Sequence, residues 1–477
     1  MQIHRRDFLK SAAAQAAALE IARGAPQQKA RPNFLFMIAD DLYYHGVRAM
    51  GNSEVETPNI DRLMSRGCVF TSCYHQGSWT GAVCIASRTM LNTGLTAFRA
   101  HKEVEQTPLW AETFGKAGYK TFIIGKWHLS KAALARAFQE MGPVSPGMFA
   151  STPVDGEAYN RPAPGNTWTP WDKSLKGQWL HTAQWAKAAH DEIKHSAAIW
   201  ADGAVEHLQK VAHQSEPFFM YVGFNSPHDP RQAPKEFCDR YPYARIEVPP
   251  NFLPEHPFDQ GDHRVRDELL APFPRTRQAV QVHRSEYYAH ITYMDEHIGR
   301  IVDALERTGK ADNTYVILTA DHGLAVGQHG LMGKQNLYDH STRMPYVICG
   351  PGIQHRKVDQ FMYQHSTFPT ACELAGIPVP KPVEFPSVGP LIHGSGKEQQ
   401  DAMFCWYRTF QRSVRTREHK LIVYPEVGVT QLFDMVKDPW EITNIAGKRE
   451  NKALEAHLRQ RLRKFQTDLG DDSAKPV

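Results

Sequence analysis

Short apolar runs alternate along the chain with amphipathic stretches, and this alternation constrains the fold more than any other feature. Residues 33–39, 119–124, 217–224 and 314–319 are apolar runs of strand length. Between them lie stretches whose apolar residues are three and four positions apart, the period of a helix. This order predicts a mostly parallel sheet with helices on its faces, which is an α/β architecture.

Helices are expected over residues 57–66, where Pro58 suits the first turn, over 108–117, and as a long helix around 288–305. The C-terminal part differs. Its sequence pattern predicts a small antiparallel sheet and a charged helix. The expected strands cover residues 403–410, 413–423 and 431–435, and the helix covers 451–467.

The chain divides into four expected regions. At 477 residues it is long enough for one large domain and a smaller one. We expect a tail at 1–30, a main domain at 31–375, a Pro-rich linker at 376–400 and a C-terminal subdomain at 401–477. A net charge of +4 is too small to indicate nucleic-acid binding. Apolar runs also stay short of the ~18 residues that span a bilayer.

The first residues have the composition of a targeting segment. The run His4-Arg5-Arg6-Asp7-Phe8-Leu9-Lys10 resembles a twin-arginine export signal, and an alanine-rich stretch follows over 11–22. Gln15 and Glu20 interrupt that stretch, so a basic tail remains the alternative. We predict export to the periplasm.

Two composition features leave alternatives open. Residues 151–200 hold five of the ten tryptophans, which either pack under a long loop or form an aromatic mouth suited to a sugar ring. The seven cysteines show no CxxC pattern, so most are expected to be small buried apolar residues. The tryptophans are Trp168, Trp171, Trp179, Trp185 and Trp200.

Reactive side chains follow the ends of the expected strands, at the edge where sites form in open α/β sheets. Asp40-Asp41 and Asp321-His322 each come directly after a strand. Adjacent carboxylates repel one another unless a cation intervenes, so the two pairs could converge on a hard cation such as Ca²⁺. A solvated turn is the alternative, and the nitrogen of His322 is not the ligand that such ions prefer.

Cys84 opens the run Cys84-Ile85-Ala86-Ser87-Arg88, which we place where a loop enters a helix. Unpaired N–H groups at the helix start and Arg88 one turn later would make this corner electropositive. Such a corner suits an anion and an activated nucleophile. The alternative is a small buried thiol.

Six ordered elements together resemble the sulfatase family within the alkaline-phosphatase superfamily, over roughly residues 32–350. Residues 432–434 and 438–444 resemble that family's small terminal subdomain. His322, where many members have asparagine, resembles the branch that includes iduronate and choline sulfatases. The elements are Asp40-Asp41, Cys84-x-Ala-Ser-Arg88, Gly125-Lys126-Trp127-His128, Pro227-His228, Asp321-His322-Gly323 and Gly333-Lys334.

The resemblance implies an alkaline-phosphatase-like fold and hydrolysis of a sulfate ester. The tryptophan-rich segment and the loop of His228 favour a sulfated carbohydrate as the substrate, with another sulfate ester as the alternative. The resemblance also implies that a maturating enzyme converts Cys84 to formylglycine (3-oxoalanine), whose hydrate attacks sulfur. It further implies Ca²⁺, or alternatively Mg²⁺, as the metal. Lys126 and Lys334 would grip the sulfate, Arg88 would orient formylglycine, His128 would act on its hydrate, and His228 would contact the sulfate or leaving oxygen. The implied metal ligands are Asp40, Asp41, Asp321, His322 and an oxygen of modified Cys84.

Several alternatives stay open. Ala86 stands where many members have proline, which leaves open the maturation route. A phosphonate or phosphate monoester hydrolase would use the same scaffold. A catalytically silent glycan-binding protein would keep an intact thiol at Cys84. Further residues that either line the site or lie in solvated loops are Asp229, His329, Gln335 and His340.

Overall fold

The computed structural model describes residues 31–145, 149–150, 182–188, 192–398 and 400–472. Residues 32–477 belong to one unit of the chain. The expected export signal at 1–30 lies outside the described residues, as do Trp168, Trp171 and Trp179 of the tryptophan-rich segment.

A nine-stranded sheet forms the centre of the fold, with strand order β13-β2-β12-β11-β1-β10-β4-β5 and β14 beside β2. All its neighbouring strands are parallel except β12, which runs antiparallel to β11 and β2. The predicted mostly parallel α/β sheet is therefore confirmed. The strands are β1 (Asn33–Ala39), β2 (Cys68–Tyr74), β4 (Lys120–Lys126), β5 (Glu140–Ser145), β10 (Phe218–Gly223), β11 (Thr314–Ala320), β12 (Arg343–Cys349), β13 (Arg356–Val358) and β14 (Met362–Tyr363).

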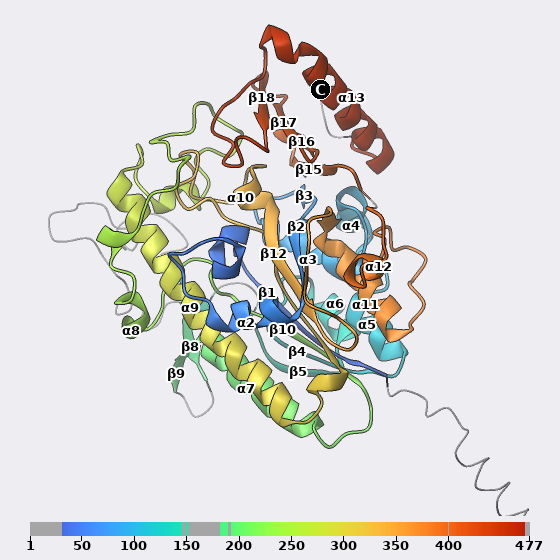
Figure 1. The fold of residues 1–477 in the computed structure, drawn as a ribbon. Helices are drawn as coiled ribbons and strands as arrows, with labels where there is room; N and C mark the ends of the chain where they lie inside the picture. Colours follow the sequence, from blue (N-terminus) through green and yellow to red (C-terminus); the bar gives the residue numbers. More distant parts are fainter. Residues whose placement is uncertain (1–30, 146–148, 151–181, 189–191, 399, 473–477) are drawn as a thin grey trace, which may run out of the picture. The chain divides into compact units, whose positions relative to one another are not determined.

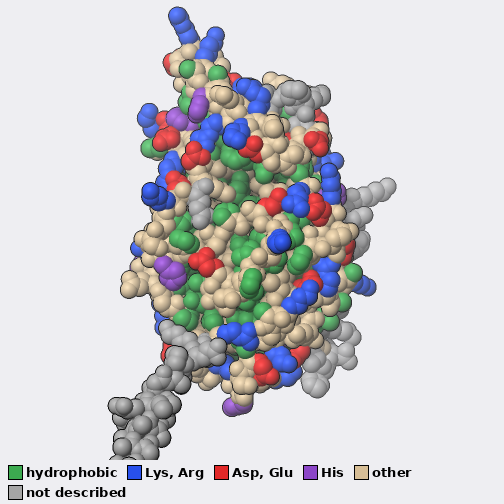
Figure 2. Space-filling view, turned by 90° about the vertical axis from the view of Figure 1, so that its right-hand side faces the viewer, with side chains coloured by type: hydrophobic (Ala, Val, Ile, Leu, Met, Phe, Trp, Pro, Cys, Tyr) green, Lys and Arg blue, Asp and Glu red, His purple; other side chains and the backbone are tan. Residues whose placement is uncertain are grey.

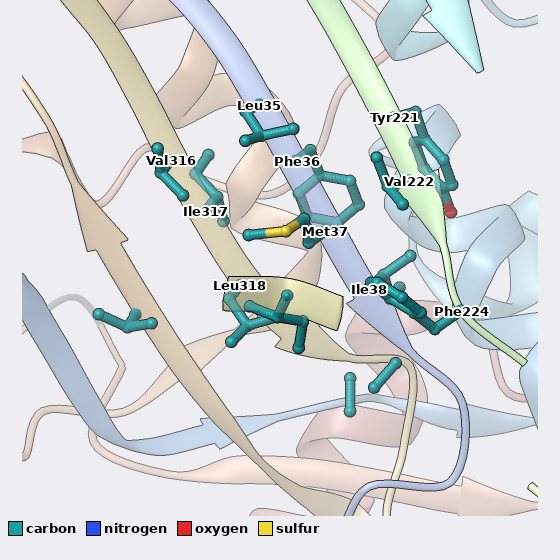
Figure 3. Close-up of a cluster of buried hydrophobic side chains, with 14 of the residues drawn as sticks. Leu35, Phe36, Met37, Ile38, Tyr221, Val222, Phe224, Val316, Ile317 and Leu318 are labelled. Atoms are coloured by element: carbon teal, nitrogen blue, oxygen red, sulfur yellow. The ribbon is translucent and has the colours of Figure 1, made fainter. Parts of the chain in front are cut away.

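Strand β1 lies at the middle of this sheet between β10 and β11, and all its residues are buried. Helices cover both faces, so side chains on either side of β1 enter the core; this explains why its sequence is a continuous apolar run. Figure 3 shows Leu35, Phe36, Met37 and Ile38 beside residues of the two neighbouring strands.

Helices lie on both faces of the sheet (Figure 1). One face carries α2 (Pro58–Arg66), α7 (Ser196–Val211) and α9 (Arg277–Arg307), and the other carries α3 (Val83–Thr93), α5 (Trp110–Lys116), α6 (Lys131–Ala137) and α11 (Thr367–Ala375). Helix α9 is longer than predicted. It begins after Thr276, whose hydroxyl accepts the N–H of Ala279 at 3.1 Å and caps the helix.

Shorter elements connect these layers. Two-stranded pairs are formed by β6 (Phe149–Ala150) with β7 (Thr182–Ala183) and by β8 (Trp185–Lys187) with β9 (Ile193–His195). The short helices are α4 (Ala97–Glu103), α8 (Lys235–Cys238), α10 (Asp339–Thr342) and α12 (Gly389–Ile392).

The C-terminal part forms an antiparallel sheet of β15 (Met403–Tyr407), β16 (Gln411–Arg415), β17 (His419–Tyr424) and β18 (Val429–Asp434), followed by α13 (Lys452–Leu469). The expected single strand 413–423 is wrong. Thr416 N–H donates to the carbonyl of His419 at 2.8 Å, and the resulting turn divides this stretch into β16 and β17. The strand β3 (Gly77–Ser78), just before Cys84, pairs with β15 in parallel.

The proline-rich stretch 376–400, expected as a linker, is packed against the main fold. Phe385, Val388, Leu391 and Ile392 are buried, and the last three belong to the main hydrophobic core. Its apolar side chains, spaced between prolines, explain this packing.

Figure 2 shows basic and acidic side chains interspersed on one face of the molecule. None of the described helices combines the length and the apolar character needed to cross a membrane.

Candidate active site

Two neighbouring strands place the dipeptides Asp40-Asp41 and Asp321-His322 side by side. In β1 and β11 the last residues, Ala39 and Ala320, are register partners, so Asp40-Asp41 and Asp321-His322 leave the sheet at the same edge. The backbone N–H of Asp321 donates to the carbonyl of Ala39 at 3.1 Å, which extends the pairing.

These two dipeptides, together with Cys84 and His228, form a buried set of potential metal-donor atoms. One atom from each of Asp40, Cys84, Asp321 and His322 lies within 4.8 Å of the others, and the same holds for Asp40, Asp41 and His228. Asp40 Oδ1, Asp41 Oδ2 and His322 Nε2 are buried and find no hydrogen-bond partner in the described part of the chain. Unpaired buried carboxylate oxygens are costly, so this donor set fits a divalent cation.

Two lysines contact the acidic pair. The ammonium group of Lys126 contacts Asp40 Oδ2, and Lys334 Nζ lies 2.7 Å from Asp41 Oδ1. Burial and the charge of Asp321 push the pKa of Asp40 upward, but the positive charges led by Lys126 outweigh both and hold it below its ordinary value. Burial dominates at Asp41 and raises its pKa well above the ordinary value despite Lys334.

Cys84 is the second residue of α3, as the sequence predicts. Its Sγ lies 3.2 Å from His128 Nδ1 and 3.8 Å from Lys126 Nζ. Arg88, one turn later, is fully buried; its Nε donates to Asp321 Oδ2 at 2.8 Å and its Nη1 to the carbonyl of Lys126 at 2.8 Å. Arg88 therefore joins the helix to the ends of β4 and β11, which are separated by β1 and β10 in the sheet.

Two site residues have a left-handed backbone. Asp41 has a φ of 68° and His128 a φ of 69°, a conformation that costs a residue other than glycine about 1 kcal/mol or more. The surrounding contacts hold them there. Tyr287, for example, donates its hydroxyl to the carbonyl of Asp41. Strain of this kind is concentrated at functional sites.

A cavity of about 480 Å³ opens on this cluster. Of the predicted site residues, Cys84, Lys126, His128, His228 and Lys334 line it, whereas Arg88 and the carboxylates lie behind its wall. The other lining residues are Gly81, Ala82, Val265, Arg266, Asp267 and Gln335.

Sequence reasoning missed the loop that holds Arg266. Arg266 Nη2 lies 2.8 Å from Asp229 Oδ1 and forms a second ion pair with Asp267, whose other oxygen accepts Gln335 Nε2 at 2.8 Å. In the sequence, Arg266 and Asp267 are adjacent charged residues in a segment without periodicity, which is typical of a solvated loop. Only their contacts with Asp229 and Gln335 in the structure show that Asp267 is buried. No signal in the sequence marks them.

The structure distinguishes the four residues that the sequence placed either at the site or in solvated loops. Gln335 lines the cavity, and Asp229 lies behind Arg266. His329 and His340 are buried and stack on Tyr338, with ring centroids 3.8 Å and 5.5 Å from it. They are thus neither solvated nor part of the cavity wall.

Comparison with known proteins gives a family assignment for residues 32–468. The family model of the sulfatases matches residues 32–377, and that of the N-sulphoglucosamine sulphohydrolase C-terminal region matches residues 327–468. An N-acetylglucosamine-6-O-sulfatase of Bacteroides thetaiotaomicron is 26% identical over 530 residues, which cover 96% of this chain and 90% of that protein.

Two solved structures share the fold. BT4656, in complex with its substrate D-glucosamine-2-N,6-O-disulfate, superposes with a TM-score of 0.72 at 21% identity, covering 94% of this chain and 99% of the other. A phosphonate monoester hydrolase from Silicibacter pomeroyi gives a TM-score of 0.71 at 21% identity, covering 93% and 96%. With a family model matched over most of its length, the chain belongs to the sulfatase family, whose members are sulfuric ester hydrolases.

Proposed function

We propose that the chain hydrolyses a sulfate ester of a carbohydrate, with formylglycine formed from Cys84 as the nucleophile. The observation that carries this proposal is the convergence of two lysines, two histidines and Cys84 on one cavity at the start of α3. The N-terminal end of a helix and two ammonium groups together favour a small anion such as sulfate.

A divalent cation, Ca²⁺ or alternatively Mg²⁺, would be held by Asp40, Asp41, Asp321 and His322, with an oxygen of modified Cys84. Their buried, unpartnered donor atoms among the described residues support this set. When bound, the cation would supply positive charge to the attacking oxygen and to the sulfate.

The two lysines would hold the sulfate oxygens. Burial lowers the pKa of each ammonium, but the negative charges around it, led by Asp40 for Lys126 and by Asp41 for Lys334, together outweigh burial and keep the pKa above its ordinary value. Both therefore stay charged and can stabilise the negative charge that builds on sulfate oxygens in the transition state.

His128 is suited to take a proton from the group at position 84. Burial, followed by the charge of Lys126, lowers the pKa of His128 to about 3, so the ring is neutral at ordinary pH and can accept a proton. His228, also at the cavity, would contact the sulfate or the leaving oxygen.

A sulfated carbohydrate fits the rest of the cavity. Arg266, Asp267 and Gln335 provide donors and acceptors for ring hydroxyls at its wall. The relatives named above include proteins that act on sulfated glucosamine derivatives.

We further propose residues 31–375 as the catalytic domain, 401–477 as a subdomain that closes one side of it, and export to the periplasm.

A phosphonate or phosphate monoester hydrolase is the second candidate, because a phosphonate monoester hydrolase shares the fold. Sulfate and phosphate esters of one leaving group separate the two. The sulfatase proposal expects a higher kcat/KM for the sulfate ester, and a clear preference for the phosphate ester would refute it.

The mass of the peptide that carries residue 84, taken from protein made in its native host, tests the nucleophile. Conversion of the thiol to formylglycine lowers the mass by about 18 Da. An intact thiol would instead support the silent glycan-binding alternative. Cys84→Ser should abolish turnover where maturation accepts only cysteine, and retained activity would contradict the assignment.

A further inference from the structure

We propose that Gln184 and Asp229 are positioning residues that hold His228 in place at the catalytic cavity. His228 lines this cavity, whereas the side chains of Gln184 and Asp229 lie behind it. Gln184 binds the main chain of His228, and Asp229 fixes its ring. The assignment rests on the proposed function and deepens it, because it names what orients the histidine that would contact the sulfate or the leaving oxygen.

The imidazole ring of His228 needs such support. The last torsion of a histidine side chain has a broad, two-fold preference, so hydrogen bonds decide which edge of the ring faces the cavity. His228 Nε2 lies 3.9 Å from Asp41 Oδ2, on the side of the acidic cluster. A ring turned over about its last torsion would place a carbon atom there instead of the nitrogen.

Asp229 fixes the other nitrogen of the ring. His228 Nδ1 lies 2.7 Å from the carbonyl oxygen of Asp229 and 3.3 Å from its Oδ1. A carbonyl oxygen only accepts, so Nδ1 carries a proton and donates it. Arg266 Nη2 donates to the same Oδ1 at 2.8 Å, and Arg266 Nε donates to Asp267 Oδ1 at 2.9 Å. The ring is thus tied through Asp229 to the Arg266 loop.

Gln184 holds the main chain of the same histidine. Its Nε2 donates to the carbonyl of His228 at 2.9 Å, and its Oε1 accepts the hydroxyl of Ser196 at 2.8 Å, which fixes the orientation of the amide. Its backbone N–H donates to Gln232 Oε1 at 2.8 Å, in the segment that follows His228. Gln184 belongs to the tryptophan-rich segment 151–200. The described end of that segment therefore reaches the site from behind the cavity wall.

Both anchors are shielded from water. Gln184 and Asp229 are each only 3% exposed, so water cannot readily replace the bonds that they make. A substitution that removes one anchor leaves a buried polar group without its partner, and the loop of His228 relieves this cost by moving. A displacement of about 1 Å at a reacting group can lower the rate about 100-fold.

Steady-state kinetics of the matured full chain on 4-nitrocatechol sulfate test this assignment. We expect Asp229→Ala and Gln184→Leu each to lower kcat/KM by about 10- to 100-fold, with most of the loss in kcat, because positioning acts in the transition state. Asp229→Asn keeps an oxygen that Arg266 can bind and should lose less than Asp229→Ala. Unchanged kcat/KM in both Asp229→Ala and Gln184→Leu would overturn the proposal.

Two matched controls remove comparable buried groups outside the cavity. Asp471→Ala removes a buried aspartate paired with Arg412, and Gln431→Leu removes a buried glutamine that accepts the hydroxyl of Tyr338. Both should keep kcat/KM.

A double-mutant cycle separates positioning from a general loss of structure. In the His228→Ala background neither Asp229→Ala nor Gln184→Leu should lower kcat/KM by more than about twofold further, since the residue that they position is gone. Losses that multiply with that of His228→Ala would overturn the proposal, because Asp229 and Gln184 would then act by another route.

Crystal structures of Asp229→Ala and Gln184→Leu keep the test independent of turnover. We expect the ring or the main chain of His228 to leave the position in which Nε2 lies 3.9 Å from Asp41 Oδ2. An unmoved His228 in both variants would overturn the proposal even if the wild-type chain hydrolysed no sulfate ester. Failure of the proposed function would show separately, as an absence of turnover by the matured wild-type chain.

Discussion

At the scale of single residues, the charge of Lys334 is the clearest candidate for transition-state stabilisation. Its ammonium lies at the cavity wall 2.7 Å from Asp41 Oδ1. Lys334→Met removes that charge and should lower kcat/KM for a sulfate ester by about 10²- to 10³-fold, as for other groups that stabilise a developing anion. Lys357→Met, an exposed strand lysine, is the control. A loss below about threefold would remove Lys334 from this role.

The metal proposal is tested at Asp40. Its Oδ1 is buried without a partner among the described residues, so Asp40→Asn should weaken cation binding. We expect the wild-type melting temperature to rise with added Ca²⁺ and the variant to show a much smaller rise, since a ligand of the folded state stabilises it by RT ln(1 + [L]/Kd) and a larger Kd makes this term smaller. Asp61→Asn, which changes an acidic residue of α2 outside the donor cluster, controls for the loss of one negative charge. Equal shifts in wild type and Asp40→Asn would contradict the site.

At the scale of elements, the close approach of β4 and β10 depends on a glycine in each strand, Gly125 and Gly223. Gly125 has a φ of +89°, and a Cβ there would lie 2.0 Å from the carbonyl oxygen of Gly223. Because a backbone atom cannot move away cheaply, Gly125→Ala should lower the free energy of unfolding by more than the ~1–2 kcal/mol that a left-handed φ alone costs. Gly376→Ala, with a φ of +65° and open space around it, measures that smaller cost in the same urea titration. Equal losses in the two variants would show that the strands adapt.

Most helices and strands could be predicted because the conformation that their sequence favours locally is also the one in which their apolar side chains are buried in the fold. Strand β1 was predicted with its observed bounds, since its apolar run is buried on both faces. The C-terminal stretch 413–423 was not, because a tight turn at Thr416 contains no glycine or proline to mark it. Strand β3 could not be expected at all, since two residues form a strand only when β15 lies beside them.

At the scale of the whole molecule, a buried ion triad joins the C-terminal sheet to the main fold. Lys420 of β17 lies 2.9 Å from Asp339 at the start of α10 and 2.8 Å from Glu441, and all three side chains are nearly inaccessible. Lys420→Met leaves the buried Glu441 without its cation and Asp339 with only the longer pair to Arg343 at 3.7 Å, which should cost about 3–5 kcal/mol of unfolding free energy.

The control for this triad is Lys437→Met, which breaks an exposed pair with Asp434 and should cost less than about 1 kcal/mol. Adding Asp339→Asn and Glu441→Gln to Lys420→Met should restore part of the loss, because the unpaired charges are then removed. A loss below about 1 kcal/mol in Lys420→Met itself would show that the triad does not hold the sheet.

Buried histidines make the whole molecule sensitive to acid. Burial lowers the pKa of both His195 and His329 to about 3, against 6.5 when unfolded. Between about pH 3 and 6.5 only the unfolded chain binds a proton at these histidines. Their contribution to the free energy of unfolding is therefore complete above pH 6.5 and is lost as the pH falls below 6.5. Each group contributes about 1.4 kcal/mol per pH unit. Asp295, whose pKa burial raises to about 6, acts in the opposite direction between 3.8 and 6.

Urea titrations at pH 7 and 5 measure this effect. His195→Gln should reduce the difference between the two unfolding free energies, whatever its effect at pH 7. An unchanged difference would show that His195 is not protonated selectively in the unfolded chain.

The sequence by itself determined that a mostly parallel sheet forms with helices on its faces, where several of its strands and helices lie along the chain, and which residues follow the strand ends, because buried strands and helix periods leave local patterns. It also determined that Cys84 begins a helix. Only the tertiary structure decided that Asp40-Asp41 and Asp321-His322 meet, since that depends on β1 and β11 being neighbours in register. The same is true of the Arg266 loop, whose partners lie far from it in the sequence. Each is built from segments far apart in the chain, and no local pattern records which distant side chains lie against one another.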